Sequence, residues 1–583
     1  MSANVRRKWL TTISKAAGLA RRWLCPASSN LNNRTHNKRN ENKAMTTLLN
    51  SSRTSGLIRK PFLCKILALA LMGASLALFL CAAGGLSYGD SARSKPSILT
   101  VETHYYPTFG KPNDALVTAD DAYVLVSVSE PTGVQVFRNP DFTNPCGGQH
   151  ILNFPRPWPR LPPLKAVDGM QFFPGSPQVS VGAAVEAYGA EFFRLASLSA
   201  PCAVDGVINI QQYPLIPDCG ASHCPPGTFD IAVTPDGEYA FVANEYGVMP
   251  SPTPTTEIGY GTVGIIRVER DDAGRFTPGT RSIEHNNTIY IPGGNTIPGI
   301  TISHDGKYLY VTCEGSADGI NPQTLNPYRD PTNVQSTQNG PVLCPGCRTN
   351  VKKCDNESDG RHENNGLLTV IDVAKATSGM GQASIITSIA SGCSPVRAVE
   401  TENGQYLFVA ARGLNKELPP QQGTSGYQIL AFDVSKLVSR RGLSNTGLDP
   451  SSPSTSARPT PTPRPRPNPN PPNDALVGQG DSGGTAPVGI ALFGNNDNLL
   501  AVANSNRFYN NSECVNPPPG APPCTASVAI LDVSNPAAPA VQQIIPNAND
   551  AFPRNVTVGP DGTTLYVPNY DAKLLEVITT SVH

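Results

Sequence analysis

Five charged residues offer acid, base and cation chemistry at comparable places in a repeated pattern. They are Glu245, Glu314, Arg397, Arg412 and Arg554. A carboxylate from this set could activate a water molecule, and an arginine could stabilise the oxyanion that forms. The alternative is that each residue is ordinary repeat or loop chemistry. The set is therefore a hypothesis for a catalytic site, and its members must meet in space to support it.

An acidic segment offers a second kind of chemistry. Asp355, Glu357 and Asp359 stand at alternate positions before Gly360, a spacing that wraps oxygen atoms around Ca²⁺. The twelfth position is Gly366 instead of the usual bidentate glutamate. The alternatives are a calcium site and a solvated acidic turn.

The cysteines separate several classes of cofactor site. Cys344 and Cys347, with Cys354 near, form half of a zinc-site pattern, and disulfides are the competing interpretation. No Cys-x-x-Cys-His motif occurs, which excludes covalent c-type haem on this sequence.

The elements that must position these residues repeat along the chain. Each copy alternates apolar and polar residues, turns at an Asp-Gly or similar pair, and continues as a second apolar strand. The copies begin at Ala115, Gly169, Phe229, Pro298, Arg397, Val488 and Pro553, the second being divergent. Most copies are followed by a third apolar strand, and a fourth can be placed before the next copy. The sequence therefore predicts an all-β, seven-bladed propeller of four-stranded antiparallel blades.

The two ends of the chain are expected to share the last blade. That blade has three strands before His583, and a spare strand, Ile98–Val101, precedes the first copy. We expect this strand to close the ring and to bring Leu99 near Leu575. The turns between first and second strands then lie on one face, here called the hairpin face. The connections after the second strand and between blades lie on the other, the loop face.

The repeats resemble a known family. The pattern of Val556–Asn569, in which Pro560-Asp561-Gly562 precedes Leu565-Tyr566-Val567, is similar to the YVTN-type propeller repeats. Their superfamily includes seven-bladed lactonases and haem-carrying nitrite reductases. The resemblance covers about residues 98–578. Asn244-Glu245 and Pro553-Arg554 are similar to stretches of lactonase-type propellers, where polar residues at the channel mouth bind the lactone.

Charge divides the chain into parts. Residues 1–83 hold 14 Lys/Arg and one acid, which leaves 31 basic and 44 acidic residues, a formal charge of −13, in the remainder. An acidic folded part argues against nucleic-acid binding. We predict a basic, disordered region over 1–60, an export signal or membrane anchor over 61–89 and the propeller over 95–583. The apolar run is 66–83, and both cleavage and anchoring remain open; Met1 and Met45 are alternative starts.

The insertions gather on one face. The long ones, 245–262, 314–366, 412–427 and 505–525, all fall on the loop face, whereas 449–473 is a Pro-rich excursion in the fifth blade. Cys146 and Cys202 lie in equivalent loops of neighbouring blades and are predicted to join them. Close local pairs are Cys219/Cys224 and Cys514/Cys524.

These observations leave two functions. The first is an exported monomer, periplasmic or extracellular, that binds a small molecule or an envelope protein. In this case the membrane is involved only through an uncleaved N-terminal segment. The second is a lactonase-like hydrolase at the channel mouth.

Overall fold

A computed structural model describes most of the predicted propeller and the start of its closing strand. The residues described are 98–147, 151, 166–174, 179–185, 189–197, 200–211, 216–217, 223–224, 227–244, 247–248, 258–259, 261–282, 288–291, 294–295, 297–316, 354–355, 366–415, 425–439, 474–506, 526–547 and 551–582. Residues 1–60, the apolar run 66–83 and the Pro-rich segment 449–473 lie outside this set. Within it, no helix is long and apolar enough to cross a membrane.

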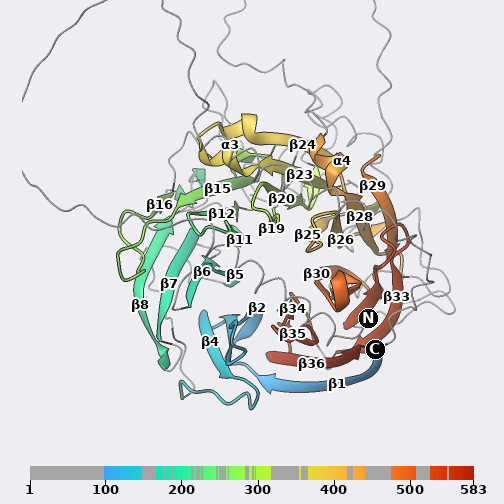
Figure 1. The fold of residues 1–583 in the computed structure, drawn as a ribbon, viewed down its shortest axis with the longest axis horizontal. Coiled ribbons are helices and arrows are strands. Elements are labelled where there is room, and N and C mark those ends of the chain that lie inside the picture. Colours follow the sequence, from blue (N-terminus) through green and yellow to red (C-terminus); the bar gives the residue numbers. More distant parts are fainter. Residues whose placement is uncertain are drawn as a thin grey trace, which may run out of the picture. The chain divides into compact units, whose positions relative to one another are not determined.

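Seven antiparallel sheets stand around a central axis, which confirms the predicted propeller (Figure 1). In blades 1–3 the strands are β2 (Lys111–Val117), β3 (Tyr123–Ser129) and β4 (Gly133–Arg138); β5 (Val167–Phe172), β6 (Ser180–Val185), β7 (Gly189–Ser197) and β8 (Ala200–Gln211); and β11 (Thr228–Val233), β12 (Tyr239–Asn244), β15 (Thr262–Arg267), β16 (Arg281–Ser282) and β17 (Ile289–Tyr290). A fourth strand was expected at the outer edge of β4. There the N–H of Ile151 donates a hydrogen bond to Val134 O of β4, at 3.0 Å.

Blades 4–6 follow the same plan. Their strands are β19 (Gly299–Ile302), β20 (Tyr308–Cys313), β23 (Leu367–Asp372) and β24 (Ile385–Ala390); β25 (Pro395–Glu400), β26 (Tyr406–Ala411), β28 (Gln428–Asp433) and β29 (Leu476–Asp481); and β30 (Pro487–Phe493), β31 (Leu499–Asn504), β32 (Ser527–Asp532) and β33 (Ala540–Pro546). Short helices α3 (Val373–Thr377) and α4 (Val434–Ser439) follow the third strands of blades 4 and 5, each beginning after an aspartate.

The termini share blade 7, as predicted. Its order is β1 (Ile98–Pro107), β36 (Leu574–Val582), β35 (Thr564–Asn569) and β34 (Thr557–Val558). The expected register was wrong, because Leu575 pairs with Tyr106 and not with Leu99. β1 continues to Pro107 through Thr, Glu and His residues. β1 is the outermost strand of its blade, so its side chains can face water. Polar residues are therefore compatible with a strand that continues to Pro107.

Four of the hairpin turns are locked by side chains in the same way. In blade 3, Thr234 Oγ1 donates to Asp236 Oδ1 at 2.5 Å and accepts Tyr239 N–H at 3.0 Å. Gly237 takes φ = 70° between them, a value that favours glycine. The same lock occurs in blades 1, 4 and 5 at Thr118, Ser303 and Thr401. The turn is thus specified locally in these four blades.

The core lies between neighbouring blades. Every residue of β3, β31 and β32 is buried, since each sheet is covered on both faces. One apolar cluster contains Phe408 of blade 5, Leu500 of blade 6 and Leu565 of blade 7. Packing of this kind makes one blade depend on the next.

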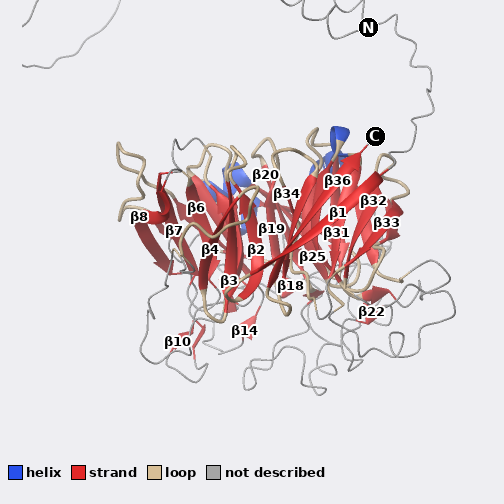
Figure 2. Ribbon diagram, turned by 90° about the horizontal axis from the view of Figure 1, so that it is seen from below, coloured by secondary structure: helices blue, strands red, loops and turns tan. Residues whose placement is uncertain are grey.

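The two faces differ in what they carry (Figure 2). The short strands β10 (His223–Cys224), β14 (Ile258–Gly259), β18 (Gly294–Asn295) and β22 (Cys354–Asp355) lie on one side of the blades and the helices on the other. These strands come from connections after second strands and between blades, which are those of the loop face. Its elaboration, predicted from loop length, therefore includes ordered two-stranded sheets.

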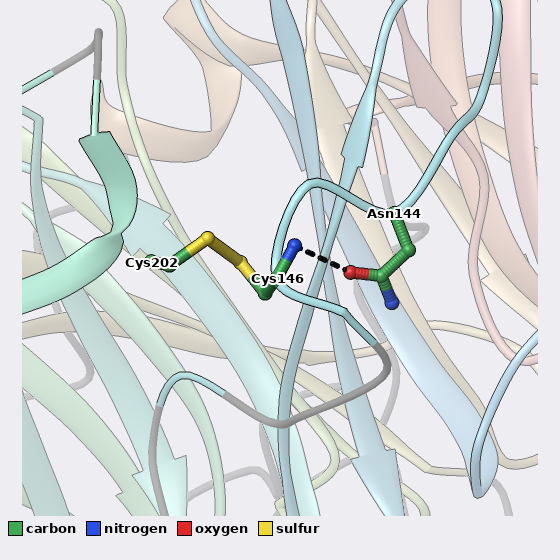
Figure 3. Close-up of a disulfide and its surroundings, with 3 residues drawn as sticks. All are labelled: Asn144, Cys146 and Cys202. Atoms are coloured by element: carbon green, nitrogen blue, oxygen red, sulfur yellow. Dashed lines mark hydrogen bonds between the residues drawn. A yellow bond between two sulfur atoms is a disulfide. The ribbon is translucent and has the colours of Figure 1, made fainter.

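One predicted disulfide joins two blades. Cys146, after β4, is bonded to Cys202 in β8, with Cα atoms 5.4 Å apart (Figure 3). Asn144 Oδ1 accepts the N–H of Cys146 at 2.9 Å. Cys393 is also disulfide-bonded, and Cys313 is a buried free thiol. Cys219, Cys344, Cys347, Cys514 and Cys524 lie outside the described residues.

Glu191 in β7 generates a pH-dependent prediction. Its side chain is 2% exposed and burial raises its pKa to about 8. The folded state therefore holds a proton that the unfolded state releases near pH 4.5. The stabilisation by this proton is present at low pH and is lost as pH rises through 8.

We expect the free energy of unfolding to fall by about 4 kcal/mol between roughly pH 5 and pH 9 because of this group. In Glu191→Gln this slope should be absent, whereas the exposed Glu238→Gln should retain it. Urea unfolding across that pH range measures both. Equal slopes in the wild type and Glu191→Gln would contradict the assignment.

Candidate functional site: the channel mouth

The innermost strands carry a ring of polar residues and glycines at one register position. The occupants, from blade 1 to blade 7, are Asp114, Gly169, Asp230, Gly299, Arg397, Gly489 and Asn555. Polar residues occupy the odd blades and glycines the even ones. We call this set the inner ring.

The glycines let neighbouring blades approach. A Cβ atom at Gly169 would lie 2.2 Å from Asp230 Oδ1, and one at Gly299 would lie 2.2 Å from Val396 O. At Gly489 a Cβ would lie 2.5 Å from the Cα of Asn555. No side chain fits at such distances, so each even blade must present bare backbone here.

The aspartates use that backbone. Asp114 Oδ2 accepts the N–H of Met170 at 2.8 Å, and Asp230 Oδ2 accepts the N–H of Ile300 at 3.1 Å. Both donors directly follow a glycine of the inner ring. Asn555 Nδ2 donates to Asp114 Oδ1 at 2.7 Å and so joins blade 7 to blade 1. Each bond links the inner edges of neighbouring blades.

Arg397 neutralises the buried carboxylates. Its Nη1 pairs with Asp230 across the width of blade 4, and its side chain is 19% exposed. Burial lowers the pKa of Arg397, but Asp230, Asp114 and Asp168 raise it more, so the net shift is upward. Burial also raises the pKa of Asp114, against the opposing effects of Arg397, Met170 N–H and Asn555. Arg397 is therefore a counterion within the ring.

Arg554 reaches across the channel. Its Nη2 lies 3.5 Å from Asp168 Oδ1 in blade 2. Its Cζ lies 5.6 Å from the ring centroid of Phe229 in blade 3, and 5.6 and 5.3 Å from those of Phe552 and Tyr570 in blade 7. The guanidinium thus extends over the mouth of the channel on the loop face.

Glu314 and Arg412 form a separate pair. Both directly follow the second strand of their blades, 4 and 5, and Arg412 Nη2 lies 2.7 Å from Glu314 Oε2. Their side chains are 10% and 9% exposed. Breaking a buried pair of this kind would leave a charge without its counterion.

The predicted site residues meet only in part. Arg397 and Arg554 both contact the aspartates of the channel, while Glu314 and Arg412 engage each other. Glu245, Glu357 and Asp359 lie outside the described residues. Asp355 lies in β22, which pairs with β27 (Leu414–Asn415). In the part of the chain that the structure describes, no cluster of three or more His, Cys, Asp or Glu side chains could hold a metal ion.

The sequence interpretation missed the acidic half of this site. Asp114, Asp168 and Asp230 each look like an ordinary polar residue at the start of a strand. The signal that could have found two of them is the alternation of polar residues and glycine when the seven copies are aligned.

The hydrogen bonds of the inner-ring carboxylates leave few lone pairs for acid–base catalysis. Asp114 accepts bonds from Ala115 N–H, Met170 N–H and Asn555. Asp230 accepts bonds from two backbone N–H groups and pairs with Arg397. A general base needs a lone pair that a water molecule can reach. The arrangement therefore suits structural support and recognition better than proton transfer.

Comparisons with known proteins concern the fold. No protein-family model matches the chain, and no curated protein sequence matches it significantly. Similar solved structures include a chain of the mitotic checkpoint complex (8% identity, TM-score 0.43, 85% of this chain and 95% of the other). Others are Kuenenia stuttgartiensis hydrazine synthase (13%, 0.42, 85% and 100%) and the Myceliophteria thermophila Cps50 (Swd1) β-propeller domain (8%, 0.42, 83% and 100%). Such values give no argument about function.

Removal of the Arg397 charge tests its role as counterion. We expect Arg397→Met to lower the free energy of unfolding by roughly 3–5 kcal/mol, because Asp230 is left as a buried charge. Adding Asp230→Asn should restore part of this loss. Urea unfolding of the single and double variants measures the coupling.

The matched control is Arg275→Met. Arg275 pairs with Asp271 at 2.7 Å, but its side chain is 54% exposed, so its loss should cost less than about 1 kcal/mol. Equal effects of the two single variants would show that Arg397 is not the counterion of a buried carboxylate.

Proposed function

We propose that this chain is an exported propeller of the YVTN repeat type that binds a partner protein at the cell envelope through its loop face. The observation behind this proposal is the mutual neutralisation of charge at the channel mouth. Arg397 pairs with Asp230, Arg554 with Asp168 and Glu314 with Arg412. The carboxylates of these three pairs, which lie among the described residues, are thus committed to arginines, whereas a hydrolase needs an uncommitted base there and a binding surface does not.

The elaboration of the loop face supports the same proposal. Four two-stranded sheets rise from its connections, β9 (Ile216–Pro217) with β10, β13 (Gly247–Val248) with β14, β18 with β21 (Gly315–Ser316) and β22 with β27. Ordered loops on a rigid scaffold are where binding residues gather in many proteins.

A lactonase-like site is the alternative. Arg397 and Arg554 are at the mouth as this alternative requires, and its base would be Glu245. It predicts lactone hydrolysis that is lost on Glu245→Gln.

Binding and hydrolysis are separated by two measurements on the full chain. A photo-cross-linker, p-benzoylphenylalanine, is placed at Asp571 on the loop face or at Glu238 on the hairpin face in the producing cells. We expect one adduct of defined mass from position 571 and none from 238. Lactones tested with and without Ca²⁺ should be hydrolysed at the background rate. Equal adducts from both faces, or hydrolysis that needs Glu245, would overturn the proposal.

Export is supported by the basic residues that precede the apolar run 66–83 and by the disulfide between Cys146 and Cys202. Disulfides persist in oxidising compartments and are rare in the cytosol.

Alkylation of free thiols in intact producing cells tests export. We expect Cys146 and Cys202 to be protected until a reductant is added, and the Cys146→Ser/Cys202→Ser variant to show no such change at these positions. Mass spectrometry of the same sample identifies the first residue and so distinguishes cleavage from anchoring. Immediate alkylation of both cysteines would contradict export.

A further inference from the structure

We propose that Arg554 and Lys111, which share the ring of Tyr570, form a receptor for a carboxylate group. This rests on the proposed function, because it names what the loop face would recognise. The carboxylate could belong to an acidic side chain of a partner protein or to a free small molecule.

Arg554 has donors to spare. A guanidinium carries five N–H groups, and among the described residues the side chain has one partner oxygen, that of Asp168, at 3.5 Å. This distance is at the limit of a hydrogen bond. Its side chain is 22% exposed, so the remaining donors have access to solvent. Arg194, by comparison, is 5% exposed and makes two bonds to Asp205, at 2.8 and 2.6 Å.

Aromatic rings hold the Arg554 guanidinium in place. Phe229, Phe552 and Tyr570 all lie within 5.6 Å of its Cζ, and Phe552 and Tyr570 meet edge to face at 5.9 Å. The backbone beneath is also fixed, since Arg554 N–H donates to Pro568 O at 3.0 Å and Tyr570 N–H donates to Phe552 O at 2.8 Å. A cation ordered before binding loses less entropy when a ligand arrives.

Lys111 adds the second positive charge. Its Nζ lies 5.0 Å from the centroid of Tyr570, so the two cations are within about 10 Å of each other. Lys111 pairs with Glu130 at 3.1 Å, and the Glu130 side chain is 62% exposed. Exposed pairs are weak and exchange readily. A ligand carboxylate can therefore take the place of the Glu130 carboxylate, because the two groups have the same chemistry.

The surrounding charge favours a carboxylate over a phosphate. Asp168 lies below Arg554, Glu130 is beside Lys111, and Asp571 acts on Lys111 through its charge. With Arg397 close enough to act on Asp168, these carboxylates leave little net positive charge among the described residues. This disfavours a group that concentrates two negative charges on itself, as a phosphate does. The aromatic walls further favour a carboxylate attached to a planar or apolar group.

Calorimetric titration of the full chain tests the proposal with two probes. One is isophthalate, a planar dicarboxylate, and the other is the capped peptide acetyl-Glu-Tyr-Glu-amide. We expect Arg554→Met to weaken binding at least about tenfold, since charge-assisted bonds are lost. Arg554→Lys keeps the charge without the planar fork and should also weaken it. Glu130→Gln should strengthen binding roughly two- to fivefold by removing the competitor.

The controls separate binding from folding. Arg275→Met removes an exposed arginine elsewhere and should leave binding unchanged. Glu130→Gln changes an exposed residue, so its gain of affinity does not depend on how well Arg554→Met folds. Urea midpoints of all variants identify any loss of the fold.

The results distinguish the source of the carboxylate and separate the receptor from the proposed function. Binding of the peptide alone supports a protein source for the carboxylate, and binding of isophthalate alone supports a small molecule. Absence of binding by both probes, in the wild type and in Glu130→Gln, overturns the receptor. If the loop-face adduct at position 571 still forms in that case, the proposed function survives without this site. If the probes bind and no adduct forms, the receptor stands and the protein-binding function fails.

Discussion

The closed ring depends on buried carboxylates that bond to the backbone of the next blade. An aspartate taken out of water is costly unless its oxygens are satisfied. Asp114 and Asp230 meet this requirement with N–H groups that follow Gly169 and Gly299. The bonds form only where a glycine lets the blades approach, so the charge of one blade and the bare backbone of its neighbour require each other.

The odd number of blades places one exception in this pattern. Polar residues and glycines alternate from blade 1 to blade 7, and an alternation over seven positions cannot close on itself. Two polar residues therefore meet where the ring joins, and they are Asn555 and Asp114. Two aspartates would repel each other there. A neutral amide instead donates to the carboxylate and turns the exception into one more link between blades.

The two arginines of the channel differ in how far the protein uses them. Arg397 is surrounded by carboxylates and serves the ring from within. Arg554 lies at the mouth, and three aromatic rings and one distant carboxylate hold its guanidinium while part of it faces solvent. The two arginines thus have different roles according to their depth in the channel. Arg397 supports the ring, and Arg554 is available for recognition.

Much of the fold could be predicted from the sequence, whereas the acidic half of the site was missed. Repeats, turns and the Cys146–Cys202 bond are encoded by local patterns or by equivalent positions in neighbouring copies. The alternation of polar residues and glycines in the aligned copies could have pointed to Asp114 and Asp230. Their partners include backbone N–H groups of neighbouring blades, and a single repeat does not reveal these. Glu314 and Arg412 were predicted at the mouth but pair with each other, because each has the same place in adjacent blades. The extension of β1 was missed since its polar residues resemble a loop.

The strand that closes blade 7 also sets the order in which the protein can be completed. Of the described strands, β1 is made first and β36 last, yet Ile98 pairs with Val582. During synthesis β1 therefore remains unpaired with β36 until β36 has been made. A contact between such distant segments is slow to form and leaves the partly built ring open to aggregation. A chain cut short before Leu574 would lack β36, and β1 would then have no strand of blade 7 to pair with.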